Sequence, residues 1–141
     1  MVAGQELPEG YECVLHGAHS SVFIDLRAKK KLMKRPVTED QRAQLDNLVT
    51  RYANGGPTAL PSNKFNGSEG WFPSDRAPNK IRLEAFKPWK LRAYGFCREF
   101  NGRPTFFITG IDPSKKQDHA RPEILQSAGA EAVRINNILN K

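Results

Sequence analysis

The chain has 141 residues, of which 38% are hydrophobic and 26% charged. This composition fits one globular domain with one core, and excludes a wholly disordered chain. The 22 Lys and Arg outnumber the 15 Asp and Glu and give a net charge of +7, which favours polyanionic partners such as RNA, DNA or an acidic protein.

Cysteine usage and the N-terminus bear on the compartment. Cys13 and Cys97 have no metal-ligand spacing, and Cys97 lies in an apolar run where a buried thiol is expected. Residues 1–10 lack the charged and apolar regions of a signal peptide, and no apolar run approaches the about 20 residues that span a bilayer. The histidines do not cluster with other ligands. We therefore expect a cytoplasmic protein with no membrane partner, no metal site and no cofactor.

The first third of the chain predicts a loose start, two strands and a basic run. Residues 1–10 contain glycines and proline and are expected to be loose, whereas residues 11–15 and 21–26 are strand candidates. The basic run 27–35 either extends the second strand or forms a short helix. A solvated, lysine-protected sheet edge is the favoured interpretation.

The clearest helix is predicted over residues 38–54. Thr38 is a good N-cap residue, Gln41 completes a capping-box pattern, and Gly55 is suited to end the helix. Apolar side chains recur at helical spacing along this stretch and predict one face packed on a sheet. Residues 55–79 are rich in Gly, Pro, Ser and Asn and predict a long irregular loop.

Three antiparallel strands and a helix are predicted to complete the fold. Residues 80–86 and 89–97 alternate in polarity, and residues 105–111 form a nearly continuous apolar run. Asn101–Gly102 is a strong hairpin signal, and residues 122–140 show helical spacing. The chain is thus expected to be a single α+β domain over residues 1–141, with helices packed on a small, mostly antiparallel sheet.

Two basic features are candidates for chemistry. Lys115, Lys116, His119 and Arg121 follow the last strand within seven residues, where cations could hold phosphates and a histidine could transfer a proton. An ordinary solvated loop is the alternative interpretation. The cationic and aromatic side chains that alternate on two strands could hold RNA by phosphate contact and base stacking, or could simply divide between solvent and core. These are Arg82, Lys90, Arg92, Tyr94 and Phe96.

The stretch from Trp89 to Phe96, the hairpin and the run from Thr105 to Ile135 resemble the end of RelE/HigB-type toxins, a family within the RelE/ParE superfamily that includes phage-derived proteins. Lys115 and Lys116 match the lysine pair of the family, and Arg92 matches its basic strand position. The long stretch 55–79 departs from the family pattern.

The resemblance implies a RelE-like fold and the toxin of a bacterial toxin–antitoxin system. Its expected activity is metal-independent endonuclease cleavage of mRNA on the ribosome, and its expected partners are an antitoxin protein, mRNA and the ribosome. The catalytic residues expected from the resemblance are Arg92, Lys115, Lys116 and His119. The expected RNA-binding residues are Arg82, Lys90, Tyr94, Arg98 and Arg121.

Two other classes of function remain open at this point. One is a toxin of the same fold that inhibits a protein target instead of cleaving RNA. The other is a non-enzymatic RNA- or protein-binding module of mobile-element origin. The sequence therefore leaves open whether the chain is an enzyme, with RNA endonuclease activity as the favoured interpretation.

Overall fold

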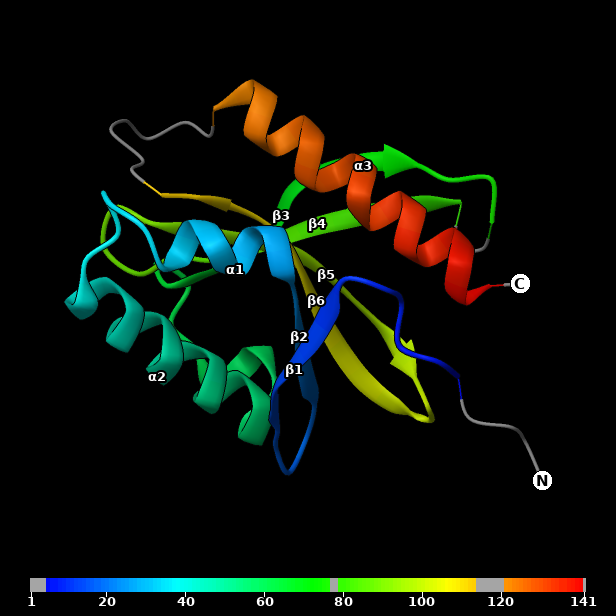
Figure 1. Ribbon diagram of the computed structural model, residues 1–141. Helices are drawn as coiled ribbons and strands as arrows, with labels where there is room; N and C mark the ends of the chain where they lie inside the picture. Colours follow the sequence, from blue (N-terminus) through cyan, green and yellow to red (C-terminus); the bar gives the residue numbers. More distant parts are fainter. Residues whose placement is uncertain (1–4, 77–78, 114–120, 141) are drawn as a thin grey trace.

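The computed structural model describes residues 5–76, 79–113 and 121–140. They form a six-stranded sheet with helices on both faces (Figure 1), which confirms the predicted α+β class. The elements in chain order are β1 (Tyr11–His16), β2 (Ser21–Asp25), α1 (Leu26–Leu32), α2 (Glu39–Gly55), a short 3-10 helix (Pro57–Ala59), β3 (Phe65–Pro73), β4 (Lys80–Phe86), β5 (Arg92–Phe100), β6 (Arg103–Asp112) and α3 (Pro122–Leu139).

The strand order in the sheet is β1-β2-β6-β5-β4-β3. Every neighbouring pair is antiparallel except β2 and β6, which run parallel from Ser21↔Thr105 to Ile24↔Ile108. A parallel pair needs a long crossover connection, and here α1, α2 and three strands lie between its two members. The sheet is therefore mixed but mostly antiparallel, as the sequence predicted.

Helix α2 begins where its sequence signal predicts. The Thr38 hydroxyl accepts a hydrogen bond from the Gln41 amide at 3.1 Å, and the Gln41 side chain accepts one from the Thr38 amide at 2.9 Å. This reciprocal capping box satisfies amide groups that have no partner within the helix. The helix includes Gly55, and Gly56, with a φ of 77°, follows its end.

Two hydrophobic cores lie on opposite faces of the sheet. The core under α1 and α2 contains an aromatic cluster in which the rings of Phe86 and Phe106 lie 4.9 Å apart. The core under α3 includes Phe107 and Ile135. Helix α3 approaches β6 closely, because a Cβ added to Gly110 would lie only 2.7 Å from the Cβ of Ala128.

Two stretches differ from the prediction. Residues 55–79 are not one irregular loop, because Phe65–Pro73 forms β3, which pairs with β4 at the sheet edge. An edge strand tolerates glycine and proline, since only one side of it needs a ladder of hydrogen bonds. The basic run forms α1 and not a strand edge. Asp25 starts this helix by accepting a hydrogen bond from the Arg27 amide at 2.9 Å.

Candidate nucleic-acid interface

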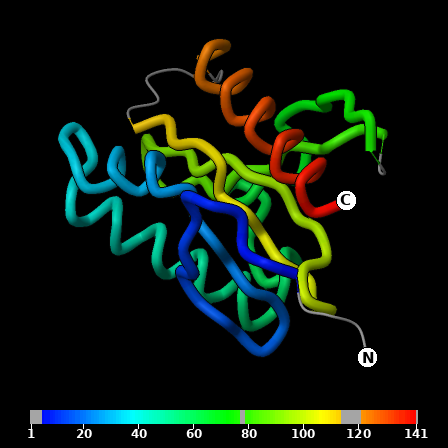
Figure 2. The backbone as a smooth tube through the Cα atoms, turned by 45° about the vertical axis from the view of Figure 1, so that its right-hand side comes forward, coloured from blue at the N-terminus to red at the C-terminus, as the bar shows by residue number. Residues whose placement is uncertain are grey.

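Three segments lie together at one end of the sheet (Figure 2). They are the connection between α1 and α2, the turn between β4 and β5, and the last residues of β6. Two hydrogen bonds join the start of α2 to the β4–β5 turn, and the pair Arg92↔Asp112 places the start of β5 beside the end of β6. We call this surface the basic end. It is defined by Lys34, Arg35, Trp89, Lys90 and Arg121.

Trp89 is the most exposed aromatic side chain of the basic end. Its backbone is fixed to α2: the amide donates to the Gln44 side chain at 3.2 Å, and the carbonyl accepts from the Gln41 side chain at 2.8 Å. The indole is 61% exposed, and the Lys90 ammonium lies 4.7 Å from its ring centroid. An exposed indole beside a cation, on a backbone held by hydrogen bonds, can stack a base and attract its phosphate.

The sequence did not indicate this role for Trp89. Alternation placed Trp89 at the start of a strand over residues 89–97, on the face opposite Lys90 and Arg92, whereas β5 begins at Arg92 and ends at Phe100. The amide of Leu91 donates to the carbonyl of Pro88 at 3.1 Å, which makes residues 88–91 a turn. The signal that could have revealed the turn is Pro88 itself, because proline rarely continues a central strand.

Arg92 is buried and not at the surface. Its guanidinium forms an ion pair with Glu69 of β3 at 2.6 Å, with side-chain exposures of 7% and 10%. Tyr94 lies beside it and is fully buried, so burial raises the pKa of Tyr94 to about 12 against the opposing effect of Arg92. In this position Arg92 links β5 to β3, which is separated from β5 by β4 in the sheet, and Tyr94 presents no ring face to a base.

The end of β6 and the start of α3 are joined by charge. Asp112 is fully buried, and its carboxylate lies 3.7 Å from the guanidinium of Arg121, the N-cap residue of α3. The segment between them carries three of the predicted catalytic residues. These residues, Lys115, Lys116 and His119, lie outside the described part of the chain.

Arg82 and Arg98 lie at the other end of the sheet. Arg98 donates hydrogen bonds to the Asn136 backbone carbonyl and to the side chains of Asn136 and Asn140, so it binds the last turn of α3. Arg82 is half-exposed and lies 5.9 Å from the ring centroid of Trp71. The structure thus places Lys90 and Arg121 at the basic end, with Arg92 buried beneath it, and separates these three residues from Arg82 and Arg98.

Within residues 5–76, 79–113 and 121–140, no three His, Cys, Asp or Glu side chains are grouped as metal ligands. In the same part of the chain, no helix is both long and apolar enough to cross a bilayer. Comparison of the chain with protein-family models, curated proteins and solved structures gave no match. Function therefore has to follow from the chemistry of the molecule's own surfaces.

Proposed function

We propose that the chain binds single-stranded RNA at the basic end and is the toxin of a bacterial toxin–antitoxin system, an endonuclease that cleaves mRNA on the ribosome. The observation that carries this proposal is the exposed, hydrogen-bonded Trp89 beside Lys90, next to the strand that leads into Lys115, Lys116 and His119. Stacking and phosphate neutralisation are the two interactions by which proteins hold single-stranded RNA.

The charge of the basic end suits this ligand. Lys34 and Arg35 are exposed in the α1–α2 connection, and Lys90 is exposed in the neighbouring turn. Lysine and arginine release counterions when they bind phosphates, so RNA binding at this surface would weaken steeply with salt. Base stacking on Trp89 would add about 1–3 kcal/mol with little dependence on base identity.

The proposed cleavage needs no metal. The ribose 2′-oxygen attacks the adjacent phosphorus, the bond to the 5′-oxygen of the next nucleotide breaks, and a 2′,3′-cyclic phosphate forms. Lys115 and Lys116 would stabilise the charge of the transition state, and His119 would transfer a proton. Arg92 would act as a positioning residue, because it is occupied by Glu69 beneath the surface.

The order of elements supports the toxin proposal. The resemblance to RelE/HigB-type toxins leads us to expect helices packed on the sheet upstream, then successive strands, a basic connection and a final helix. The described residues follow this order, with α1 and α2 before β4, β5 and β6 and with α3 at the end. An antitoxin that holds the toxin inactive is part of the same proposal.

Burial of Arg92 favours a second candidate function, an RNA-binding module that does not cleave. The strand cation expected in the catalytic set is engaged by Glu69 and is not exposed to solvent. Such a module would use Trp89, Lys90 and the neighbouring basic residues for binding alone. The two functions share the basic end and differ in whether RNA is cut.

The deciding experiment is inducible expression in a bacterial host, with growth followed and the 5′ ends of mRNA mapped. We expect growth arrest and new cuts in translated messages. Both should be lost in a variant carrying Lys115→Ala, Lys116→Ala and His119→Ala. The matched control carries Arg51→Ala and Arg76→Ala, which remove two exposed positive charges elsewhere on the molecule and should leave arrest and cleavage unchanged.

The other outcomes separate the alternatives. Arrest with intact messages would point to a protein target. Normal growth with intact messages and confirmed folded protein would leave the RNA-binding module. Salt-dependent binding of an oligouridine without guanosine that persists in the Trp89→Ala, Lys90→Ala variant would contradict the assignment of the basic end as the RNA surface.

A further inference from the structure

The sheet splits between β4 and β5. These strands pair over only three positions, from Glu84↔Gly95 to Phe86↔Ala93. By contrast, β3 pairs with β4 as far as Pro73↔Lys80, and β5 pairs with β6 as far as Phe100↔Arg103. Beyond Glu84 the two hairpins therefore diverge, and Figures 1 and 2 both show the β3–β4 hairpin turning away from the β5–β6 hairpin.

A cleft of about 420 Å³ occupies this split. Its lining comes from three strands and α3: Trp71, Lys80, Ile81, Arg82, Glu84, Phe96, Cys97, Arg98 and Asn136. Ile81 and Phe96 are the buried apolar residues of its lining, and α3 contributes Asn136. The volume lies within the range of small-molecule sites, which are mostly apolar with a few placed polar groups.

Three side chains of the cleft form a continuous row. Trp71 is paired across the strands with Arg82 and is 59% exposed. The Arg82 guanidinium lies 5.9 Å from the Trp71 ring centroid and 3.7 Å from the Glu84 carboxylate. The Glu84 side chain is only 9% exposed, so a carboxylate lies within the cleft while an indole and a cation lie near its rim.

This row matches the chemistry of an unpaired guanine nucleotide. An exposed indole stacks any base, and a neighbouring cation attracts its phosphate. A carboxylate accepts hydrogen bonds through both oxygens, so it pairs best with two adjacent N–H donors. Among the four RNA bases, guanine alone presents such a pair on its Watson–Crick edge, the ring N–H and the exocyclic amine.

We propose that the cleft between β4 and β5 binds an unpaired guanine nucleotide. The base stacks on Trp71, its Watson–Crick edge donates to Glu84, and Lys80 and Arg82 hold the phosphate. The site lies at the opposite end of β5 from the basic end. As a site for RNA it rests on the RNA-binding part of the proposed function, and it does not require cleavage.

The two tryptophans of the chain allow the two sites to be followed separately. In the Trp89→Phe variant, fluorescence reports Trp71 and therefore the cleft. In the Trp71→Phe variant, it reports Trp89 and therefore the basic end. Each variant would be titrated with GMP, AMP, CMP and UMP, and with a short oligouridine that contains one guanosine or none.

We expect GMP to quench Trp71 with an affinity at least about tenfold above that of the other nucleotides, as a bidentate base contact provides. Glu84→Gln should abolish this preference, while Glu99→Gln, an exposed carboxylate of β5 outside the cleft, should keep it. Circular dichroism would establish that both variants fold.

Each remaining outcome bears on one site. Quenching by GMP and by the guanosine-containing oligonucleotide alike indicates a free nucleotide as a ligand. Quenching by the oligonucleotide alone indicates RNA. Equal affinity for all four nucleotides, or no response of Trp71 to any ligand, would overturn the proposal. If the fluorescence of Trp89 does not change with any RNA while that of Trp71 responds selectively to guanine, the basic end is not the RNA surface, and the proposal for the cleft is still supported.

Discussion

Replacement of Glu84 by glutamine measures how much the ionised Glu84 carboxylate, buried between β4 and β5, lowers the stability of the fold. Burial raises the pKa of Glu84 from 4.5 to about 7, although Arg82 opposes the rise. Tyr52 of α2 and Cys97 of β5 also lie near Glu84, and both are neutral at pH 7 because their ordinary pKa values of 10.0 and 9.0 already lie above it. Cys97 is exposed, so the prediction of a buried thiol at this position is wrong. Removal of the charge should therefore relieve a cost that exists only when Glu84 is ionised.

The sign of the effect follows from proton binding. A raised pKa means that the folded protein binds the Glu84 proton more tightly than the unfolded chain, so the contribution to stability is present below pH 4.5 and is lost as pH rises through 7. At about 1.4 kcal/mol per pKa unit, the cost at pH 8 is at most about 3.5 kcal/mol. Relaxation around the charge would reduce it, so we expect about 1–3 kcal/mol.

Urea unfolding of the wild type and of Glu84→Gln at pH 4 and pH 8 measures this cost. The variant should match the wild type at pH 4 and exceed it at pH 8, whereas Glu99→Gln should follow the wild type at both values. Other carboxyl groups cancel in the comparison, because the proteins share them. A difference between variant and wild type that is equal at the two pH values would refute the reasoning.

Three further predictions concern stability, each measured by urea or thermal unfolding. Gly110→Ala should lower the free energy of unfolding by about 1–3 kcal/mol, because the added methyl group would meet Ala128. Adding Ala128→Gly should restore more stability than the about 1 kcal/mol that a glycine costs within a helix. No recovery would contradict the close packing of α3 on β6. Glu69→Ala should lower the free energy of unfolding by about 3–5 kcal/mol, because it leaves the Arg92 charge buried without its partner. The double variant Arg92→Met, Glu69→Leu should be within about 2 kcal/mol of the wild type in stability. Equal losses in the single and the double variant would contradict a buried ion pair. Thr38→Ala should cost about 1 kcal/mol, and an unchanged midpoint would mean that the capping box contributes nothing.

Local chemistry made several elements predictable. The capping box at Thr38 depends on residues three positions apart, and the hairpin at Asn101–Gly102 depends on two residues with φ of 53° and 80°. All the residues that determine such a cap or turn lie within a few positions of one another in the sequence. For that reason α2 and the β5–β6 hairpin lie close to where the sequence placed them.

Pairing between distant segments limited the rest of the prediction. Phe65–Pro73 has the composition of a loop and becomes a strand because β4 offers it a partner. Arg92 was predicted at an RNA surface because it alternates with apolar residues along its own strand. Its environment is instead set by Glu69, which lies in β3, the strand that the sequence did not predict. Period-two alternation assigns a side chain to a face of the sheet and does not reveal what covers that face.

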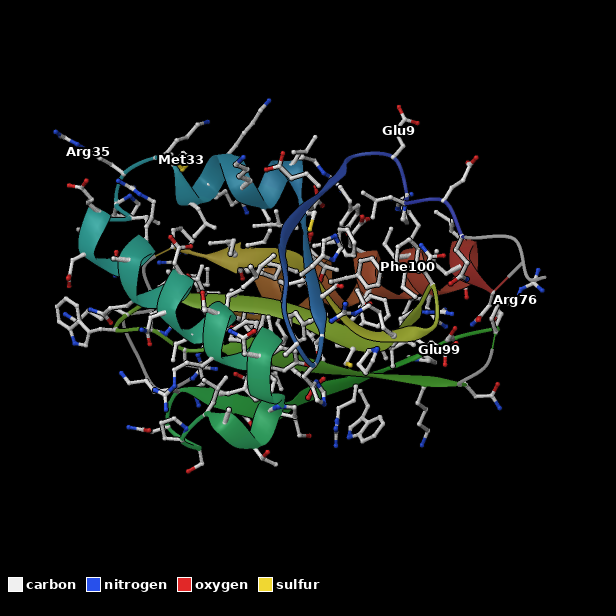
Figure 3. All side chains as sticks on the ribbon, turned by 90° about the horizontal axis from the view of Figure 1, so that it is seen from below. Glu9, Met33, Arg35, Arg76, Glu99 and Phe100 are labelled. Atoms are coloured by element: carbon white, nitrogen blue, oxygen red, sulfur yellow. The ribbon has the colours of Figure 1, made fainter. Side chains whose placement is uncertain are left out.

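Figure 3 views the molecule from the α2 side and shows α2 crossing only part of the sheet. A helix of 17 residues is about 25 Å long, so it cannot cover all six strands over their full length. Phe86 lies in the core on the α2 side, whereas Arg82, four residues earlier on β4, is half-exposed. The same alternation along one strand thus produces a core position at one end and a solvent-facing cation at the other. The length of the covering helix, more than the strand sequence, therefore determines where this sheet can meet a ligand.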